Sequence, residues 1–156
     1  MKEVKYLQQI LIQIPMELRL LKWLNEHEGA FYPSPRKEAF RGKQKGFTLS
    51  FIDHEKEAVR ITFEGSSSNA LPLYFVMFDR VIEYLKADPN TVYPIGARLQ
   101  PPYPTESIEG KIWKNPKPAN TEYKSAPHVL DILYYAGYIK YAYTRSRDTD
   151  RKVQGA

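Results

Sequence analysis

Apolar residues recur at helical spacing along the first part of the chain. Residues 4–13 and 16–28 each carry an apolar stripe with the period of an amphipathic helix, and Pro15 separates them. Proline is favoured in the first turn of a helix and glycine just after its end, so Pro15 and Gly29 fit the two ends of the second stripe. The spacing therefore predicts two helices whose apolar faces point to the core.

The pattern then changes to a strict alternation of apolar and polar residues. It runs over 47–51 and again over 59–63, with a wholly polar linker at 53–57 between the two runs. A period of two places apolar side chains on one face of a strand. The two runs predict an antiparallel β-hairpin over about 47–64 with one buried face.

Another stripe of helical spacing covers residues 71–85. It predicts a long helix from about residue 69 to Ala87, with Ser68 or Asn69 as the cap and Pro72 tolerated in the first turn. The first half is apolar on nearly every side. We therefore expect this helix to run through the centre of the fold.

The second half of the chain contains most of the prolines, because eight of the twelve lie between Pro89 and Pro127. This density predicts an irregular coil, with one short strand around 111–113. Beyond it, the spacing predicts a helix over 126–136 and a strand over 138–144, with Gly137 between them.

These elements indicate an α+β fold class, mostly helical, with the small hairpin and the Pro-rich coil. At 156 residues the chain has the size of a single domain, 1–156, in which the coil would join two sub-lobes, 1–88 and 110–156. No apolar run approaches the ~20 residues that a membrane span needs. The chain has no cysteine and no secretory signal pattern. We expect a cytoplasmic protein that does not bind membranes.

Basic residues gather in two segments of a chain whose net charge is +5. One lies in the loop before the predicted hairpin and the other at the C-terminus. Such clustering is typical of proteins that bind polyanions, although solvated loops have it too. The candidate nucleic-acid-binding residues are Arg36, Lys37, Arg41, Lys43, Lys45, Lys140, Arg145, Arg147, Arg151 and Lys152.

The C-terminal segment 125–153 carries a more specific pattern. A predicted helix ends in Ala136-Gly137-Tyr138-Ile139, and Asp148-Thr149-Asp150-Arg151-Lys152 follows the strand. This order resembles the recognition helix and wing of MarR-type winged-helix repressors, whose wing turn reads Asp-x-x-Asp-Arg-(Arg/Lys), one spacer longer than here.

The resemblance implies duplex DNA as the partner, more than RNA. The helix 126–136 would enter the major groove, and its exposed face would offer His128, Asp131 and Tyr135. The arginines of the wing would contact phosphates or the minor groove. Tyrosines at 134, 135, 138, 141 and 143 lie near these bases, which also suits stacking on unpaired nucleotides.

Two other functions remain open on the sequence. A protein–protein interaction module would dock through the Pro- and Tyr-rich coil 93–123, with Tyr93, Tyr103, Trp113 and Tyr123 as anchors.

A metal-dependent nuclease would bring together Asp88, Glu109 and Lys111. The three histidines have no metal-ligand spacing, and no nucleophile motif or cofactor motif is present. We therefore expect no cofactor and no resident metal, and a binding protein is favoured over an enzyme.

Overall fold

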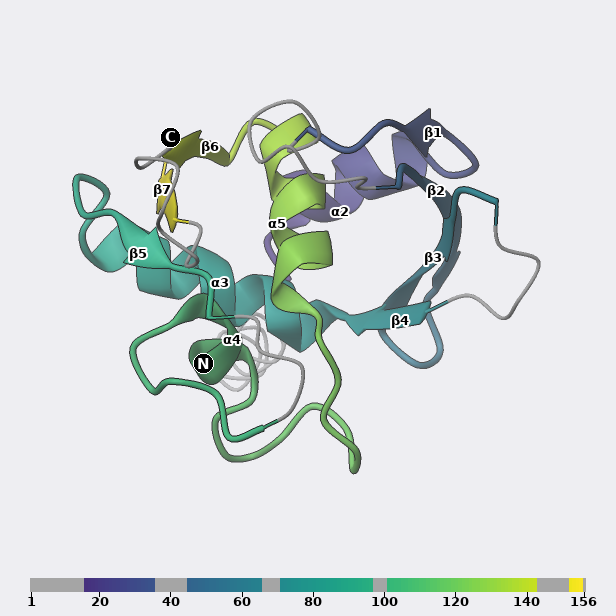
Figure 1. Cartoon of the computed structure of the whole chain (residues 1–156). Helices are drawn as coiled ribbons and strands as arrows, with labels where there is room; N and C mark the ends of the chain where they lie inside the picture. The colour runs from purple at the N-terminus through teal and green to yellow at the C-terminus, as the bar shows by residue number, and fades with distance from the viewer. Residues whose placement is uncertain (1–15, 36–44, 66–70, 97–100, 143–151, 156) are drawn as a thin grey trace, which may run out of the picture.

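The computed structural model describes residues 16–35, 45–65, 71–96, 101–142 and 152–155, and Figure 1 shows their arrangement. The helix predicted over 4–13 lies outside these residues. The described helices and strands, in chain order, are α2 (Leu18–Glu26), β1 (Phe31–Tyr32), β2 (Phe47–Asp53), β3 (Ala58–Phe63), β4 (Leu71–Tyr74), α3 (Phe75–Ala87), β5 (Tyr93–Pro94), α4 (Ile108–Ile112), α5 (Ala126–Tyr135), β6 (Ile139–Ala142) and β7 (Lys152–Gly155).

The predicted hairpin is confirmed, and it is part of a larger sheet. β2 and β3 pair antiparallel with Leu49 opposite Ile61, and both side chains are buried. On the other face, the hydroxyls of Ser50 and Thr62 share a hydrogen bond across the strands. β1 adds to the free edge of β2 and β4 to that of β3, which gives the order β1-β2-β3-β4.

The prediction of a single long helix from residue 69 to Ala87 is wrong in its first part. Residues Leu71–Tyr74 form edge strand β4, in which Leu73 lies opposite Val59 and is fully buried. An edge strand accepts Pro72, because a missing N–H there breaks no ladder between two neighbours. A short run that is apolar on every side suits a buried strand as well as a helix, and here pairing with β3 decides. The remaining part, α3, ends at Ala87 as predicted.

A second difference lies in the Pro-rich coil, where a short strand was expected around 111–113. The segment forms helix α4 instead. Ser107 begins this helix, because its hydroxyl accepts a hydrogen bond from the N–H of Gly110 at 3.0 Å. The cap pairs an N–H of the first turn that has no partner inside the helix. A single strand at this place, with no neighbouring strand, would leave the same N–H without a partner.

The C-terminal helix and strand are confirmed as α5 and β6, and the last two residues of the predicted strand, 143 and 144, lie outside the described residues. Gly137 between them has a φ of +87°, a conformation that favours glycine at a helix end. β6 pairs antiparallel with β7, and β7 pairs with β5, so Tyr93, Val153 and Tyr141 lie side by side in a second sheet of order β5-β7-β6. The described part therefore contains seven strands beside four helices and is a mixed α+β structure, so the prediction of a mostly helical domain is not confirmed.

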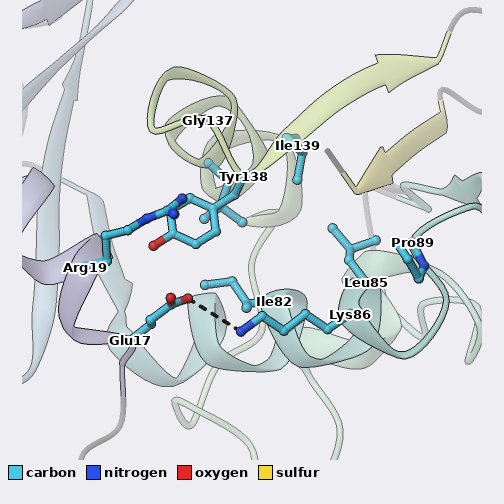
Figure 2. A pocket seen from close by; sticks show the side chains of 10 residues that line it. Glu17, Arg19, Ile82, Leu85, Lys86, Pro89, Gly137, Tyr138 and Ile139 are labelled. Carbon is cyan, nitrogen blue, oxygen red and sulfur yellow. Dashed lines mark ion pairs between the residues drawn. The ribbon is translucent and has the colours of Figure 1, made fainter.

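Helix α5 stands between the two sheets in Figure 1. Buried apolar side chains from α2 to β6, among them Leu20, Phe78 and Leu130, form one continuous cluster around it. A cavity of about 320 Å³ opens where α2, α3 and the start of β6 meet (Figure 2). None of the described helices is long and apolar enough to cross a bilayer.

Candidate nucleic-acid interface

Three of the ten candidate basic residues lie in the described part of the chain. Lys45 is exposed just before β2, and Lys140 is exposed in β6. Lys152 is the first residue of β7 and lies opposite Ala142. The other candidates, Arg36, Lys37, Arg41, Lys43, Arg145, Arg147 and Arg151, lie outside the described residues.

The strands β6 and β7 are the framework that carries the second basic segment. They are joined by residues 143–151, and the last described pair before this connection is Ala142 with Lys152. Lys140 of β6 lies opposite Gln154, and two residues, Tyr141 and Ala142, separate it from the connection. The register brings Lys140 and Lys152 into one hairpin, together with the chain segment that holds Arg145, Arg147 and Arg151.

Helix α5 does not offer the free face that groove reading needs. Seven of its ten residues are buried, Asp131 among them. The carboxylate of Asp131 accepts a hydrogen bond from the hydroxyl of Tyr141. His128 contacts the ring of Phe63 at 4.8 Å between centroids.

The third residue of the expected reading face is also engaged. Tyr135 donates a hydrogen bond to the carbonyl of Pro33 and lies 4.6 Å from the ring of Tyr32, centroid to centroid. The first sheet and the segment around Pro33 thus cover the side of α5 on which base contacts were expected. Of the described tyrosines proposed for stacking, Tyr134 alone is exposed, at 40%.

A buried carboxylate fixes the N-terminus of α5. Glu109 of α4 is fully buried and accepts hydrogen bonds from the N–H of Ser125 (2.7 Å), the N–H of Ala126 (2.8 Å) and the hydroxyl of Ser125 (3.0 Å). The N–H groups of Ser125 and Ala126 lie at the start of α5, where a helix has no partners of its own for them. Burial raises the pKa of Glu109 to about 7, against the opposing effect of the donors.

Helix α4 is itself held on α3. The guanidinium of Arg80 donates to three carbonyls at and beyond the end of α4, those of Ile112 (2.8 Å), Lys114 (2.8 Å) and Pro116 (2.6 Å). A cation at this end of a helix also complements the partial negative charge of the terminal carbonyls.

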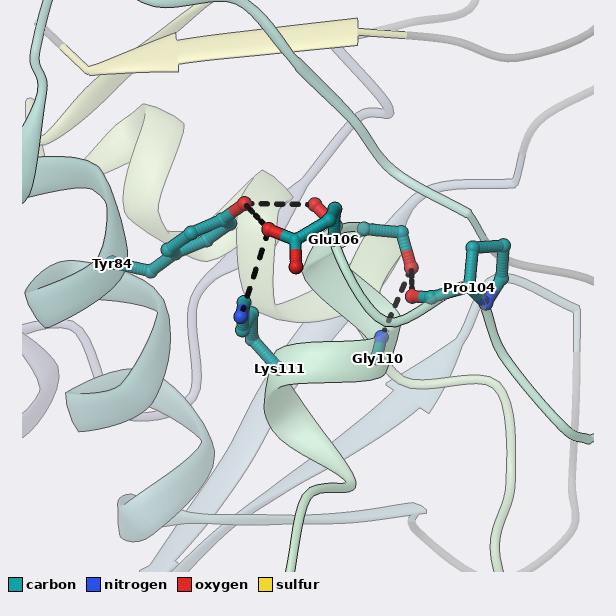
Figure 3. Close-up of polar contacts among 6 residues, drawn as sticks. Tyr84, Pro104, Glu106, Gly110 and Lys111 are labelled. Atoms are coloured by element: carbon teal, nitrogen blue, oxygen red, sulfur yellow. Dashed lines mark hydrogen bonds and ion pairs between the residues drawn. The ribbon is translucent and has the colours of Figure 1, made fainter.

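Figure 3 shows the contacts at the other end of α4. The hydroxyl of Tyr84 donates to the backbone carbonyl of Glu106 at 2.9 Å, and the ammonium of Lys111 lies 3.8 Å from the Glu106 carboxylate. The same ammonium lies 4.9 Å from the centre of the Tyr84 ring. Side chains of α3 therefore determine the position of α4 at both of its ends, and α4 in turn caps α5.

The residues considered for a nuclease centre have separate structural partners. Asp88 accepts hydrogen bonds from Thr91 and Asn90, Glu109 caps α5, and Lys111 pairs with Glu106. Among the residues that the structure describes, no group of three or more His, Asp or Glu side chains is arranged to hold a metal ion.

Of the four aromatic anchors considered for a protein-docking coil, Tyr93 and Trp113 are buried, and Tyr103 and Tyr123 are partly buried against the core. Trp113 is 4% exposed and donates its indole N–H to the carbonyl of Tyr123, whose hydroxyl in turn reaches the carbonyl of Pro72. Tyr93 is buried against the ring of Tyr84 at 4.5 Å between centroids. These rings stabilise the coil on the rest of the fold.

No protein-family model, curated protein or solved structure matches this chain. The case for a function therefore depends on the geometry and on the charges of the chain itself.

Sequence reasoning missed the residues that build this region, above all Glu109 and Arg80. One local signal was present, since Ser107-Ile108-Glu109-Gly110 has a capping residue two positions before an acid. The partners of Glu109 and Arg80 lie 16 and more than 30 residues away, so no local pattern indicates them.

Proposed function

We propose that this chain is a nucleic-acid-binding protein with a winged-helix-like C-terminal half, which contacts duplex DNA through the hairpin β6–β7. The observation that carries the proposal is this hairpin. It directly follows α5, and residues 143–151, which connect its two strands in the sequence, include Arg145, Arg147 and Arg151. A hairpin whose connecting segment is rich in arginine is suited to phosphate contacts along a groove.

The order of the elements also supports a winged-helix interpretation. A domain of this kind needs a helix before its recognition helix and a second strand to complete the wing. Here α4 precedes α5 and caps it through Glu109, and β7 pairs with β6. The connection between α4 and α5 is longer than a tight turn, because residues 113–125 separate the two helices.

The burial of α5 limits what kind of binding is proposed. Because Asp131 and Tyr135 bond to other parts of the protein, base readout by this helix is not part of the proposal. The expected contacts are to phosphates, from the segment 140–152 and from the basic loop 36–45. Such contacts give affinity and orientation with little sequence preference.

The experiment that tests the proposal is a titration of the full chain into labelled duplex DNA, followed by fluorescence anisotropy at about 50 and 200 mM salt. We expect binding in the range of about 1–100 µM that weakens steeply with salt, since non-specific binding comes from counterion release. Replacing Arg145, Arg147 and Arg151 by alanine should weaken binding and make the slope against log[salt] shallower by about 2–3.

A matched variant separates a local effect from a general loss of charge. Lys22, Lys56 and Lys114 are exposed and lie outside the proposed interface, so their triple alanine variant removes the same charge elsewhere. This variant should retain most of the affinity. Equal losses in the two triple variants would mean that no particular surface binds DNA, and absence of binding at about 50 mM salt would exclude the proposal.

A further inference from the structure

A basic side chain of α2 lies beside the start of the β6–β7 hairpin. Arg19 is exposed, and its guanidinium carbon lies 4.5 Å from the centre of the Tyr138 ring (Figure 2). Tyr138 directly precedes β6. Burial, the larger effect, raises the pKa of Tyr138, and the nearby positive charge of Arg19 opposes this rise. The contact therefore fixes a cation from a distant part of the chain next to the hairpin.

An acid close to this contact has a partner of its own. Glu17 lies at the start of α2, and its carboxylate is 3.8 Å from the ammonium of Lys86 on α3, as Figure 2 shows. Arg19 forms no ion pair with an acidic side chain of the described residues. The positive charge of Arg19 therefore adds to that of the exposed Lys140 in β6.

Stacking on the ring leaves the edge of the guanidinium open for a ligand. A cation–π contact occupies the face of the planar group, whereas its N–H groups point outward in the plane. Such an edge binds a phosphate through two parallel hydrogen bonds. The ring also limits the rotamers of Arg19 before a ligand arrives, so less conformational entropy is lost on binding.

We propose that Arg19 binds a backbone phosphate of the DNA beside β6, and that Tyr138 is the residue that positions it. This inference rests on the proposed function, because the phosphate belongs to the duplex that the hairpin binds. Lys140 follows Tyr138 by two residues, a rise of about 7 Å in an extended strand. Each DNA strand carries a phosphate about every 3.4 Å along the helix axis, so cations at this spacing can contact the same backbone. The interface then extends from the hairpin onto α2.

The test is an anisotropy titration of the full chain with labelled duplex DNA at several salt concentrations between about 50 and 200 mM. Arg19→Ala should weaken binding about three- to tenfold and make the slope against log[salt] shallower by about 1, because one phosphate contact is lost. Lys56→Ala is the matched control. It removes the same charge from the exposed turn between β2 and β3, and it should leave affinity and slope close to those of the parent.

Variants of Tyr138 test the positioning role at constant charge. Tyr138→Leu removes the ring and should weaken binding several-fold, with a smaller change of the salt slope than Arg19→Ala. Tyr138→Phe retains the ring and should bind as the parent does. The double variant Arg19→Ala, Tyr138→Leu should bind no more weakly than Arg19→Ala alone, since the ring acts through Arg19.

A second substitution of Arg19 does not depend on how Tyr138→Leu folds. Arg19→Lys changes an exposed side chain, retains the charge and loses the planar fork. It should weaken binding and leave the salt slope unchanged. Equal affinity of Arg19→Lys and the parent would mean that a fork on the ring is not required, which would overturn the positioning by Tyr138.

The outcomes separate this inference from the proposed function. Absence of DNA binding by the parent would overturn both. The inference alone is wrong if the triple variant of Arg145, Arg147 and Arg151 loses affinity while Arg19→Ala behaves like Lys56→Ala. Additive losses in the double variant would show that Tyr138 acts independently of Arg19 and would overturn its positioning role.

Discussion

The buried carboxylate of Glu109 makes the stability of this protein depend on pH in a way that can be predicted with its sign. Its pKa rises from the ordinary 4.5 to about 7 in the folded protein, mainly because burial disfavours the charged form. The folded state therefore holds a proton between about pH 4.5 and 7 that the unfolded state has released. Stability from this group is fully present below about pH 4.5 and is lost as the pH rises through 7.

The magnitude follows from the two pKa values. Moving from 4.5 to about 7 corresponds to about 3 kcal/mol of folding free energy, since each pKa unit is worth about 1.4 kcal/mol. Glu109→Gln cannot ionise, so it does not have this loss. It offers one acceptor oxygen instead of two, so one of the N–H groups of Ser125 and Ala126 loses its partner, at a cost of about 1–2 kcal/mol.

These two terms predict that the effect of Glu109→Gln changes sign with pH. The variant should be about 1–2 kcal/mol less stable than the parent at pH 5, and equal to it or more stable at pH 8. Urea unfolding of both proteins at the two pH values measures this difference. Burial also raises the pKa of Asp79 to about 7, but this contribution is common to parent and variant and cancels in the comparison.

A control separates burial from the general effect of removing an acid. Glu26 lies on α2 with an exposed side chain, and Glu26→Gln should change stability by similar small amounts at both pH values. The reasoning would be refuted if Glu109→Gln were more destabilising at pH 8 than at pH 5. That result would mean that the helix N–H groups hold the carboxylate ionised.

Three further substitutions, with Gly65→Ala as a control for one of them, test the packing around α4 and in the first sheet. Arg80→Lys should cost about 2–3 kcal/mol in urea unfolding, because an ammonium cannot reach three carbonyls in a fixed fork. Gly96→Ala should prevent stable folding, because its Cβ would lie 2.2 Å from that of Ser107; Gly65→Ala, at a positive φ in open space, should cost only about 1 kcal/mol. Leu49→Ala should destabilise the sheet by about 2–5 kcal/mol, measured in the same way, since Leu49 is fully buried.

The elements that the sequence predicted well are those whose pattern is long and local. The alternation over 47–63 specified the hairpin β2–β3, and the stripe over 126–136 with Gly137 specified α5 and the start of β6. In both cases the periodicity and the residues at the ends point to the same structure.

The elements that were missed are short or depend on distant partners. β5 has two residues and pairs with Val153 and Lys152, which lie some sixty positions later in the chain. The pattern predicts the start of a helix at β4, because the apolar residues of β4 continue directly into α3. Pairing with a neighbouring strand decides that these residues form strands. A local sequence pattern carries no information about that pairing.

The candidate interface was predicted in part. The expectation that α5 carries a free polar face was wrong, because His128, Asp131 and Tyr135 meet Phe63, Tyr141 and the segment at Pro33. A single helix pattern indicates which side is apolar, but it does not indicate that the first sheet, the segment at Pro33 and Tyr141 of β6 contact the polar side. The nucleic-acid-binding role of the basic segments stays a prediction.

The central claim is that DNA contacts the β6–β7 hairpin and not the face of α5. The most direct test is a set of amide chemical-shift changes in the full chain on addition of a short DNA duplex at low salt. We expect the largest changes at Lys140 and over residues 143–152, with His128 and Asp131 nearly unchanged. Largest changes along α5, or no changes at all, would contradict it.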